Sequence, residues 1–410
     1  MMCRGFRFCI ALALAFCCCN SCLFGQAADS DSKSNLELIG VANVPGDAVD
    51  KTGLDEILVE DIRHDRLGGF SAIARLGKGQ RFIAVSDRGP KDGAVDYLCR
   101  FHTFRIRIRP NRKRPIDIRL IDTTFFKRKD GSIFSGLALR HHDDQRFDPE
   151  GIRMLRGGNL IVSDEYGPHV IEFDSKGDEV RKYPVDNKFM IATPGQNKAE
   201  ENKNNTSGRQ GNRGMEGLAL TPSGDKYGLM QSPLIQDCSW NEEGKLEGLN
   251  CRIVELANKS KEYVYQLDDK SNKLNEILSV DEKNFLVIER DGKPGSESTY
   301  KKINLVNISG ATDVQDVNPL PAGKLSDDVS PVAKRCLIDL LDSKWGLHAN
   351  MPEKIEGLCF GNDLKDGRKT LLVLSDNDFE KQATQLFVFA VPGELLTTGA
   401  AVESNTSKTK

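Results

Sequence analysis

One plan recurs five times along this chain of 410 residues. Each copy opens on a small or acidic pair, continues through an alternating apolar segment and a polar turn, and ends a second apolar segment on charged residues. The copies lie at residues 70–90, 148–168, 214–234, 275–292 and 354–379. This pattern is typical of a β-hairpin with polar residues at both ends. Because the hairpin recurs, we expect a fold assembled from repeated units.

A second strand pattern, more exposed than the first, follows each hairpin. It lies at 104–110, 169–185, 251–269, 301–310 and 385–394. Four antiparallel strands per unit are typical of a β-propeller blade, and blades stack in a ring around a central channel. We therefore predict an all-β propeller over residues 67–395, with six blades of which five are clear repeats. The segment at 28–66 either supplies the sixth blade or closes the ring by adding an N-terminal strand to the last blade.

The first 27 residues have the layout of a secretory signal peptide. Arg4 and Arg7 precede an apolar stretch that ends at small residues around 25–27. A membrane anchor is the alternative, but the apolar core at 8–24 is shorter than the ~20 residues of a spanning helix. A lipid-modified cysteine is a third option, although no lipobox precedes the leader's cysteines. We expect a secreted or periplasmic protein that is free of the membrane once the leader is removed.

Composition narrows the range of partners. A formal net charge of -3 gives no general attraction to nucleic acid or to anionic membranes. The segment at 193–213 is polar and is expected to be a mobile loop inserted at one mouth of the ring, while the tail at 396–410 is expected to be disordered. We expect a monomer that binds a small molecule.

Five cysteines remain after the leader, and none of them forms a CxxC motif. This spacing indicates neither a zinc site nor a dense disulfide framework. A disulfide between Cys238 and Cys251 and two separately buried thiols are equally compatible with the sequence.

Acidic residues recur at the starts and ends of the hairpins. Since both ends of an antiparallel hairpin lie at one edge, we expect these carboxylates to converge on one face of the ring, near its axis. Close carboxylates repel each other, and an all-oxygen ligand set suits Ca²⁺. The candidate metal ligands are Glu150, Asp164, Glu165, Glu216 and Glu356. The structural alternative is that such residues only form turns or accept hydrogen bonds from the next blade.

Basic residues interrupt the acidic pattern in three motifs. Arg88 lies in SDRGP, Arg213 in NRGMEG and Arg290 in IERDG. Arginine matches phosphate geometry bidentately, so arginines among metal-binding carboxylates are typical of a phosphoester site. The alternative is ion pairing within the acidic cluster. The candidate catalytic residues are therefore Glu216 and these three arginines.

Motifs in a fixed order identify a resemblance. They read SDRGP (86–90), DPEGI (148–152), SDEYGP (163–168), NRGMEGLAL (212–220), QSPL (231–234), IERDG (288–292) and KIEGLCF (354–360). Over residues 70–379 the chain resembles the phytase-like family, also labelled "esterase-like activity of phytase", which we take to be a group of secreted bacterial proteins. The resemblance implies hydrolysis of phosphate esters. Two units depart from the pattern: the fourth has Asn275-Glu276 in place of Glu-Gly, and the first has Ser71 with no acid.

The leading hypothesis is a secreted propeller hydrolase of phosphate esters, with Ca²⁺ at the mouth of the channel. The acidic role is well supported for Glu150, Glu216 and Glu356, weaker for Glu276 and unsupported at Ser71. One alternative is a lactonase or carboxylesterase on the same scaffold. Another is a non-catalytic propeller that binds a ligand or partner, with its acids serving only to fix the blades.

Overall fold

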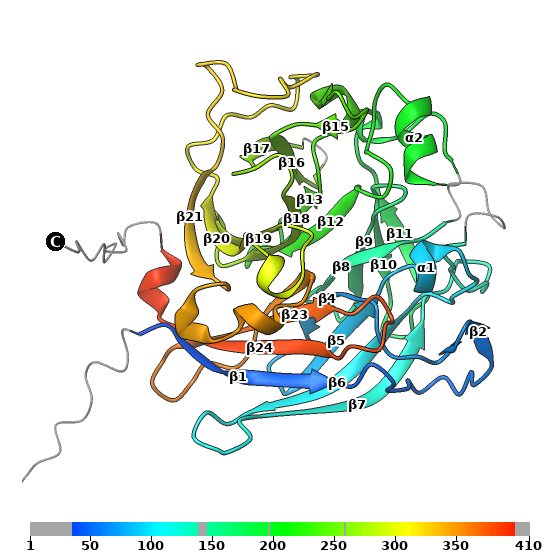
Figure 1. Ribbon diagram of the computed structural model, residues 1–410, viewed down its shortest axis with the longest axis vertical. Helices are drawn as coiled ribbons and strands as arrows, with labels where there is room; N and C mark the ends of the chain where they lie inside the picture. Colours follow the sequence, from blue (N-terminus) through cyan, green and yellow to red (C-terminus); the bar gives the residue numbers. More distant parts are fainter. Residues whose placement is uncertain (1–34, 138–145, 196, 258–259, 398–410) are drawn as a thin grey trace, which may run out of the picture.

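Five four-stranded antiparallel sheets form a β-propeller (Figure 1). The computed structural model describes residues 35–137, 146–195, 197–257 and 260–397, so the expected signal peptide and most of the expected tail lie outside the described residues. From the innermost strand outward, the first two sheets are β4 (Phe70–Arg75), β5 (Arg81–Ser86), β6 (Arg100–Ile108) and β7 (Ile116–Phe125); and β8 (Pro149–Met154), β9 (Leu160–Asp164), β10 (Val170–Phe173) and β11 (Glu179–Tyr183).

The remaining three sheets follow the same plan. They are β12 (Met215–Leu220), β13 (Lys226–Met230), β16 (Asn250–Glu255) and β17 (Glu262–Gln266); β18 (Lys273–Ser279), β19 (Asn284–Arg290), β20 (Lys301–Asn307) and β21 (Ala333–Asp339); and β22 (Lys354–Phe360), β23 (Lys369–Asp376), β24 (Thr384–Val391) and β1 (Glu37–Val44). The innermost strands contact one another in the order β4, β8, β12, β18, β22 and back to β4, which closes the ring.

The N-terminal strand completes the last blade. β1 pairs antiparallel with β24, from Glu37 opposite Ala390 to Val44 opposite Thr384. The expected count of six blades is therefore wrong, and the alternative in which an N-terminal strand closes the ring is confirmed. The rest of the segment ahead of β4 supplies only a two-stranded hairpin, β2 (Ile57–Val59) with β3 (Ile62–Arg63).

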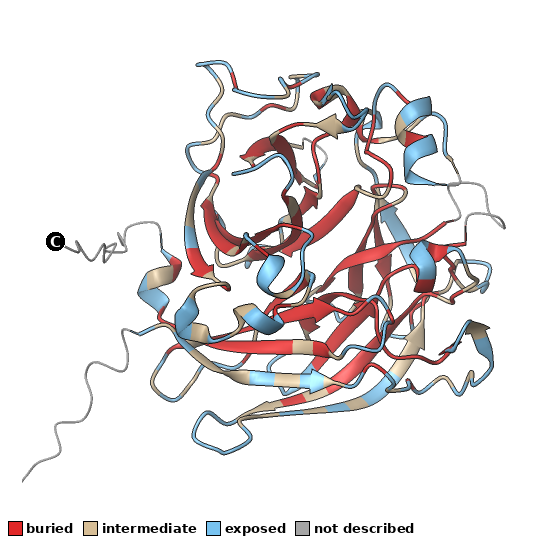
Figure 2. Ribbon diagram, in the orientation of Figure 1, coloured by how far each residue is buried: buried red, intermediate tan, exposed pale blue. Residues whose placement is uncertain are grey.

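The apolar core lies between neighbouring blades. One cluster joins β18–β20 to β22–β24 through residues such as Leu286, Ile303 and Phe389, and another joins β4–β6 to the last blade through Phe104 and Leu372. Inner strands are buried along almost their whole length, whereas β1, β7 and β11 expose side chains at the rim (Figure 2).

The two residues of each Glu-Gly pair at the start of an inner strand face different neighbours. The pairing register shifts there, between Met215 and Gly217 in β12 and at the matching positions of the other inner strands. A Cβ on Gly217 would lie 2.7 Å from the backbone nitrogen of Ile277 in the next blade, so only glycine allows this approach. The glycine therefore faces the neighbouring blade, and the preceding glutamate is free to face the channel.

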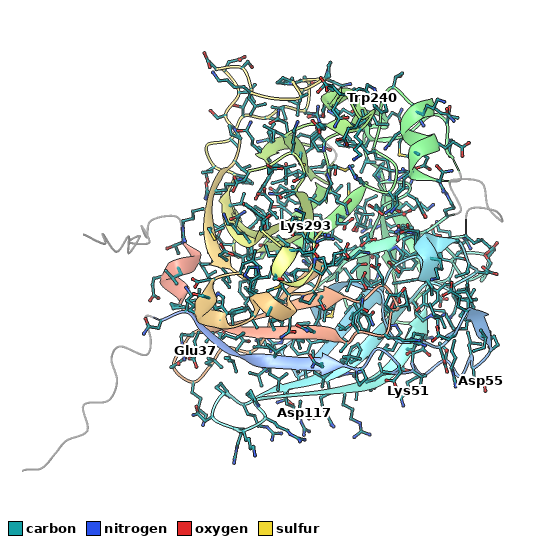
Figure 3. All side chains as sticks on the ribbon, in the orientation of Figure 1. Glu37, Lys51, Asp55, Asp117, Trp240 and Lys293 are labelled. Atoms are coloured by element: carbon teal, nitrogen blue, oxygen red, sulfur yellow. The ribbon has the colours of Figure 1, made fainter. Side chains whose placement is uncertain are left out.

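Small elements decorate the ring. The helices are α1 (Pro90–Gly93) and α2 (Lys198–Asn204), and a second hairpin pairs β14 (Ser239–Trp240) with β15 (Leu246–Glu247). Trp240, labelled in Figure 3, is 54% exposed on this hairpin. Within the segment expected to be a mobile loop, Asn197 caps α2, and the buried side chains of Glu201 and Arg209 form an ion pair. Paired charges, rather than apolar residues, give this polar segment its contacts.

The cysteines are free thiols in the described part of the chain. Cys251 is buried and Cys238 is half-buried, and no disulfide joins them, so the alternative of two separate thiols applies. Among the described residues, no helix has the length and apolar character needed to cross a membrane.

Candidate metal centre

Five side chains occupy equivalent positions at the channel mouth. Each is the first residue after the pairing register shifts near the start of its inner strand. They are Ser71, Glu150, Glu216, Asn275 and Glu356. The three glutamates are no more than 5% exposed, and one carboxylate oxygen of each lies within 4.8 Å of the others. The ring of blades thus brings together three of the five predicted metal ligands.

Few hydrogen bonds satisfy these three carboxylates. Asn275 donates from Nδ2 to Glu216 Oε1 at 2.9 Å and to Glu356 Oε1 at 3.1 Å, and Arg290 donates to Glu356 Oε1 at 2.8 Å. Glu216 Oε2 is buried without a hydrogen-bond partner. No hydrogen bond or ion pair to the Glu150 carboxylate is found within the described ranges. Unsatisfied buried carboxylate oxygens that face one another fit a cation with oxygen ligands.

The electrostatics of the site point the same way. Burial, and then the neighbouring Glu216 carboxylate, raise the pKa of Glu150 well above its usual range. Burial, and then Glu165 and Glu356, raise the pKa of Glu216 in the same direction. Without a cation these groups can avoid mutual repulsion only by binding protons.

A second acidic group shares Glu150 with the first. One oxygen each of Asp148, Glu150 and Glu165 lies within 4.8 Å of the others. Burial, and then the Asp148 carboxylate, raise the pKa of Glu165 to about 8, and its Oε1 atom is buried without a hydrogen-bond partner. Arg88 lies against this group: it forms an ion pair with Asp148, and its Nη1 atom is 3.5 Å from Glu165 Oε2. The predicted ligand Glu165 therefore lies beside the three-glutamate cluster and not within it.

Two acids proposed from the sequence point elsewhere. Asp164 Oδ1 accepts hydrogen bonds from the backbone nitrogens of Asp148 at 3.1 Å and Tyr166 at 3.0 Å, which holds the turn after β9. It belongs to none of the acidic groups that could hold a metal within the described residues. Glu276 stands where three of the other blades have glycine and the first has Ala72, and its carboxylate lies 2.9 Å from Arg153 Nη2. The bulge therefore gives Asn275, and not Glu276, the position at the channel.

A third acidic group contains its own cation. Asp87, Asp376 and Asp378 offer oxygens within 4.8 Å of one another. Lys354 Nζ lies 3.3 Å from Asp376 Oδ2 and also pairs with Asp378. An internal ammonium already offsets the charge of this group, so it fits a metal less well than the three glutamates do.

The three predicted arginines differ in what they contact. Arg88 pairs with Asp148 and Asp92, and Arg290 pairs with Glu356. Arg213 forms no ion pair within the part of the chain that the structure describes, and its Nη1 atom donates to Gln210 Oε1 at 3.0 Å. Ion pairing within the acidic cluster therefore accounts for Arg88 and Arg290. Arg213 has no such pair among the described residues, although the Glu165 carboxylate acts on it.

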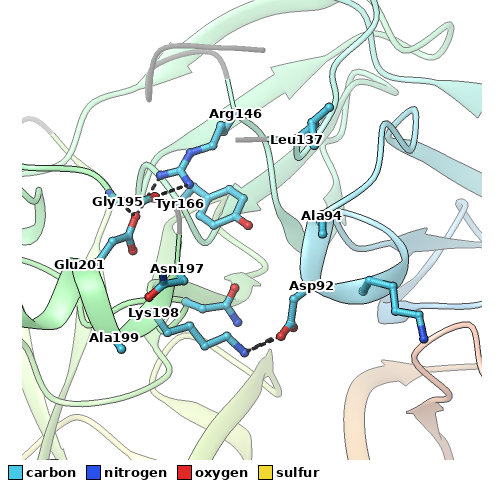
Figure 4. A pocket seen from close by; sticks show the side chains of 13 residues that line it. Asp92, Ala94, Leu137, Arg146, Tyr166, Gly195, Asn197, Lys198, Ala199 and Glu201 are labelled. Atoms are coloured by element: carbon cyan, nitrogen blue, oxygen red, sulfur yellow. Dashed lines mark hydrogen bonds and ion pairs between the residues drawn. The ribbon is translucent and has the colours of Figure 1, made fainter. Parts of the chain in front are cut away.

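A pocket of about 520 Å³ opens beside the second acidic group (Figure 4). The ring of Tyr166 lies in its wall, with the Arg146 guanidinium 4.2 Å from the ring centroid. Arg146 also pairs with Glu201 at 3.0 Å, and Lys198 pairs with Asp92 at 3.2 Å across the opening. The sequence analysis did not single out Tyr166 or Arg146, although Tyr166 lies within the SDEYGP motif.

Comparison with solved structures finds only low similarity in sequence and in superposition. A streptogramin B lyase is 11% identical with a TM-score of 0.32, covering 88% of this chain and 100% of that one. An aldose sugar dehydrogenase from Streptomyces coelicolor is 10% identical with a TM-score of 0.36, covering 83% of each chain. A gluconolactonase from Xanthomonas campestris is 11% identical with a TM-score of 0.32, covering 85% and 97%. Similarities at this level say nothing about activity.

Sequence comparison is more specific. An uncharacterized secreted protein of Arthroderma benhamiae is 23% identical over 456 residues, which cover 84% of this chain and 87% of that protein. This relative is fungal, so the expectation of a bacterial family was too narrow. The model of the family described as "Phytase-like: Esterase-like activity of phytase" matches residues 65–379. Because this match spans well over half of the chain, the protein belongs to the phytase-like family.

Proposed function

We propose that the protein is a secreted hydrolase of phosphate esters that uses Ca²⁺ at the channel mouth. The observation that carries the proposal is the cluster of Glu150, Glu216 and Glu356, which is buried and makes few hydrogen bonds. Arg213, which forms no ion pair among the described residues, lies nearby. Membership of the phytase-like family supports the reaction class.

The donor set favours a hard cation. Glu150, Glu216 and Glu356 would hold the ion, with Asp148 and Glu165 at its side, and Ca²⁺ accepts six to eight such oxygens in loose geometry. When bound, Ca²⁺ supplies Lewis-acid chemistry, which polarises a phosphoryl oxygen and lowers the pKa of water.

The chain's own residues would position the substrate. Arg213, which has no carboxylate partner in the described residues, would bind phosphoryl oxygens and stabilise the charge that grows on them. Asn275 would keep Glu216 and Glu356 oriented through its two hydrogen bonds. Arg290 would neutralise Glu356 so that the cluster does not repel an anionic substrate.

The test is turnover by the mature chain, from Ala28 onward, with Ca²⁺ and with a chelator. The panel is p-nitrophenyl phosphate, bis(p-nitrophenyl) phosphate and phytate, together with p-nitrophenyl acetate and a lactone. We expect Ca²⁺-dependent phosphate release that Glu216→Gln abolishes and that Glu380→Gln, at an exposed position, leaves unchanged. Turnover of the acetate or lactone alone would show that the protein is a carboxylesterase or lactonase and not a hydrolase of phosphate esters. No turnover of any compound would leave the non-catalytic propeller as the function.

Secretion is a separate part of the proposal. It is supported by the leader at residues 1–27 and by the similarity to a fungal protein that is described as secreted. Expression of the full chain should release a protein whose N-terminal residue is Ala28. Retention of the intact leader in the membrane fraction would contradict this.

A further inference from the structure

A second pocket, of about 830 Å³, opens beside the start of β12. Its walls include α2, the β14–β15 hairpin and the turn before β18. Arg213 and Lys273 line it, and both side chains are partly buried. The sequence analysis assigned no role to Lys273.

Among the described residues neither of these cations forms an ion pair, although the Glu165 carboxylate acts on Arg213 and the lining of the pocket also contains Glu243, Glu247 and Asp269. In the ranges that the structure describes, Arg213 makes one side-chain hydrogen bond, to Gln210, and Lys273 Nζ makes no hydrogen bond or ion pair. Other partly or fully buried cations around the channel are paired, as Arg290 is with Glu356 and Lys301 is with Asp291. A cation removed from water without a partner is unfavourable, so the pair is best satisfied by an anion that enters the pocket.

The two cations also affect each other. Burial, and then Arg213, lower the pKa of Lys273 to about 8. The other groups that act on Lys273 are Arg290, Cys238 and Cys251. Burial raises the pKa of the Cys238 thiol to about 12 and that of Cys251 well above its usual range, so neither thiol supplies a negative charge at neutral pH.

The pocket adjoins the metal centre through the backbone. Gly214 packs so closely on Glu165 that a Cβ would lie 2.0 Å from its carbonyl oxygen. The Gly214 oxygen accepts from the nitrogen of Gln231 at 2.9 Å, and the Gln231 oxygen accepts from the nitrogen of Leu274 at 3.1 Å. Arg213 and Lys273 therefore lie next to these linked residues. Each precedes a channel residue, Glu216 or Asn275, by two or three positions.

An aromatic side chain forms part of the rim. Trp240 lies on β14 opposite Leu246, lines the pocket and is 54% exposed. An exposed indole face packs well against a sugar or aromatic ring.

We propose that this pocket binds a phosphate or sulfate group without the help of the metal, with Arg213 and Lys273 as its ligands and Trp240 packed against the ring that carries the group. If the pocket is a subsite for the substrate, the assignment rests on the proposed function. Binding of phosphate or sulfate alone is independent of that function.

The experiment is a fluorescence titration of the mature chain in chelator, with inorganic phosphate and with sulfate against chloride at equal ionic strength. The chain has two tryptophans, Trp240 and Trp345, so Trp240→Phe identifies the signal that comes from the pocket. We expect a saturable change that Trp240→Phe removes. Phenyl phosphate should bind more tightly than phosphate, whereas phenol should not bind.

Variants separate this site from the metal centre. Arg213→Gln and Lys273→Gln should each weaken sulfate binding about tenfold, as expected for loss of one charge-assisted contact. Lys261→Gln, at an exposed position in the same blade, should not. Calorimetric titration repeats the measurement without relying on Trp240, and a melting temperature within a few degrees of wild type shows that a variant is folded.

The outcomes distinguish the two proposals. Glu216→Gln should bind sulfate normally in chelator even though it is expected to lose hydrolysis. Binding that requires Ca²⁺, or that keeps the wild-type affinity in both Arg213→Gln and Lys273→Gln, would overturn the pocket assignment and leave the hydrolase proposal standing. Binding in chelator without any hydrolysis would support the pocket assignment and overturn the hydrolase proposal.

Discussion

Replacing Glu216 by glutamine should have opposite effects on stability with and without Ca²⁺. Two ionised carboxylates no more than 4.8 Å apart repel by at least about 3.5 kcal/mol at an effective dielectric constant of ~20. A carboxyl can avoid this by binding a proton. From the ordinary value of 4.5, keeping it protonated at pH 7 costs 2.5 pKa units at ~1.36 kcal/mol each, or about 3.4 kcal/mol.

Whether Glu216 stays ionised or binds a proton, the metal-free wild type loses about 3 kcal/mol of folding free energy. A neutral glutamine removes that cost, and its Oε1 can still accept a hydrogen bond from Asn275. For roughly 350 ordered residues with an unfolding entropy of ~2.1 cal/mol/K each, the gain is a rise of about 4 °C in Tm. In Ca²⁺ at about one thousand times its Kd, wild type gains about 4.1 kcal/mol, which the variant should largely lose. The order of the two melting temperatures should therefore reverse.

The assay is thermal unfolding at pH 7 in chelator and in Ca²⁺, with Glu380→Gln as the matched control. Wild type should melt below Glu216→Gln in chelator and above it or level with it in Ca²⁺. The reasoning is refuted if Glu216→Gln is the less stable protein in chelator, or if Ca²⁺ raises the Tm of both proteins equally.

Three further results are expected. In chelator, Tm should fall as pH rises from about 5 to 8. The pKa of Glu165 is raised to about 8, so over this range the folded state holds a proton that the unfolded state has released. Ca²⁺ should flatten the slope, and a Tm that rises over this range would contradict the prediction. Sulfate affinity in chelator should decline as pH rises through about 8, where Lys273 loses its charge, and the decline should be absent in Lys273→Gln. Gly217→Ala should destabilise the fold by about 1–3 kcal/mol in urea titrations, because its Cβ meets the backbone of Ile277, whereas Gly157→Ala, which has open space, should not.

The repeated hairpins made the architecture predictable, because each carries its own turn and alternation signals. The number of blades was not predictable in the same way. Residues 37–44 read as a strand, but nothing local shows that the partner of this strand is β24, more than three hundred positions along the chain. Strand pairing at such separation is decided by closure of the ring and not by propensity.

The site was predictable to the extent that its residues recur. Glu150, Glu216 and Glu356 each precede a glycine, and the structure brings them together. At Asn275-Glu276 the pattern was ambiguous by one residue, and only the bulge in β18 decides which side chain faces the channel.

The role of Lys273 was not predictable from the repeat. Lys354 holds the matching position in the last blade, two residues before Glu356, but it pairs with Asp376 and Asp378, whereas Lys273 forms no ion pair within the described residues. That absence belongs to tertiary packing, which sequence spacing does not encode.

Closure of the last blade by β1 also has a consequence for synthesis. The strand from Glu37 to Val44 is made first, yet its partner from Thr384 to Val391 is made almost last. A nascent chain therefore carries an unpaired edge through nearly the whole of translation, and such edges recruit other strands. Long-range pairing of this kind also slows folding. Export while unfolded, with the ring closing only after both ends have left the cell's interior, would spare the chain this exposure.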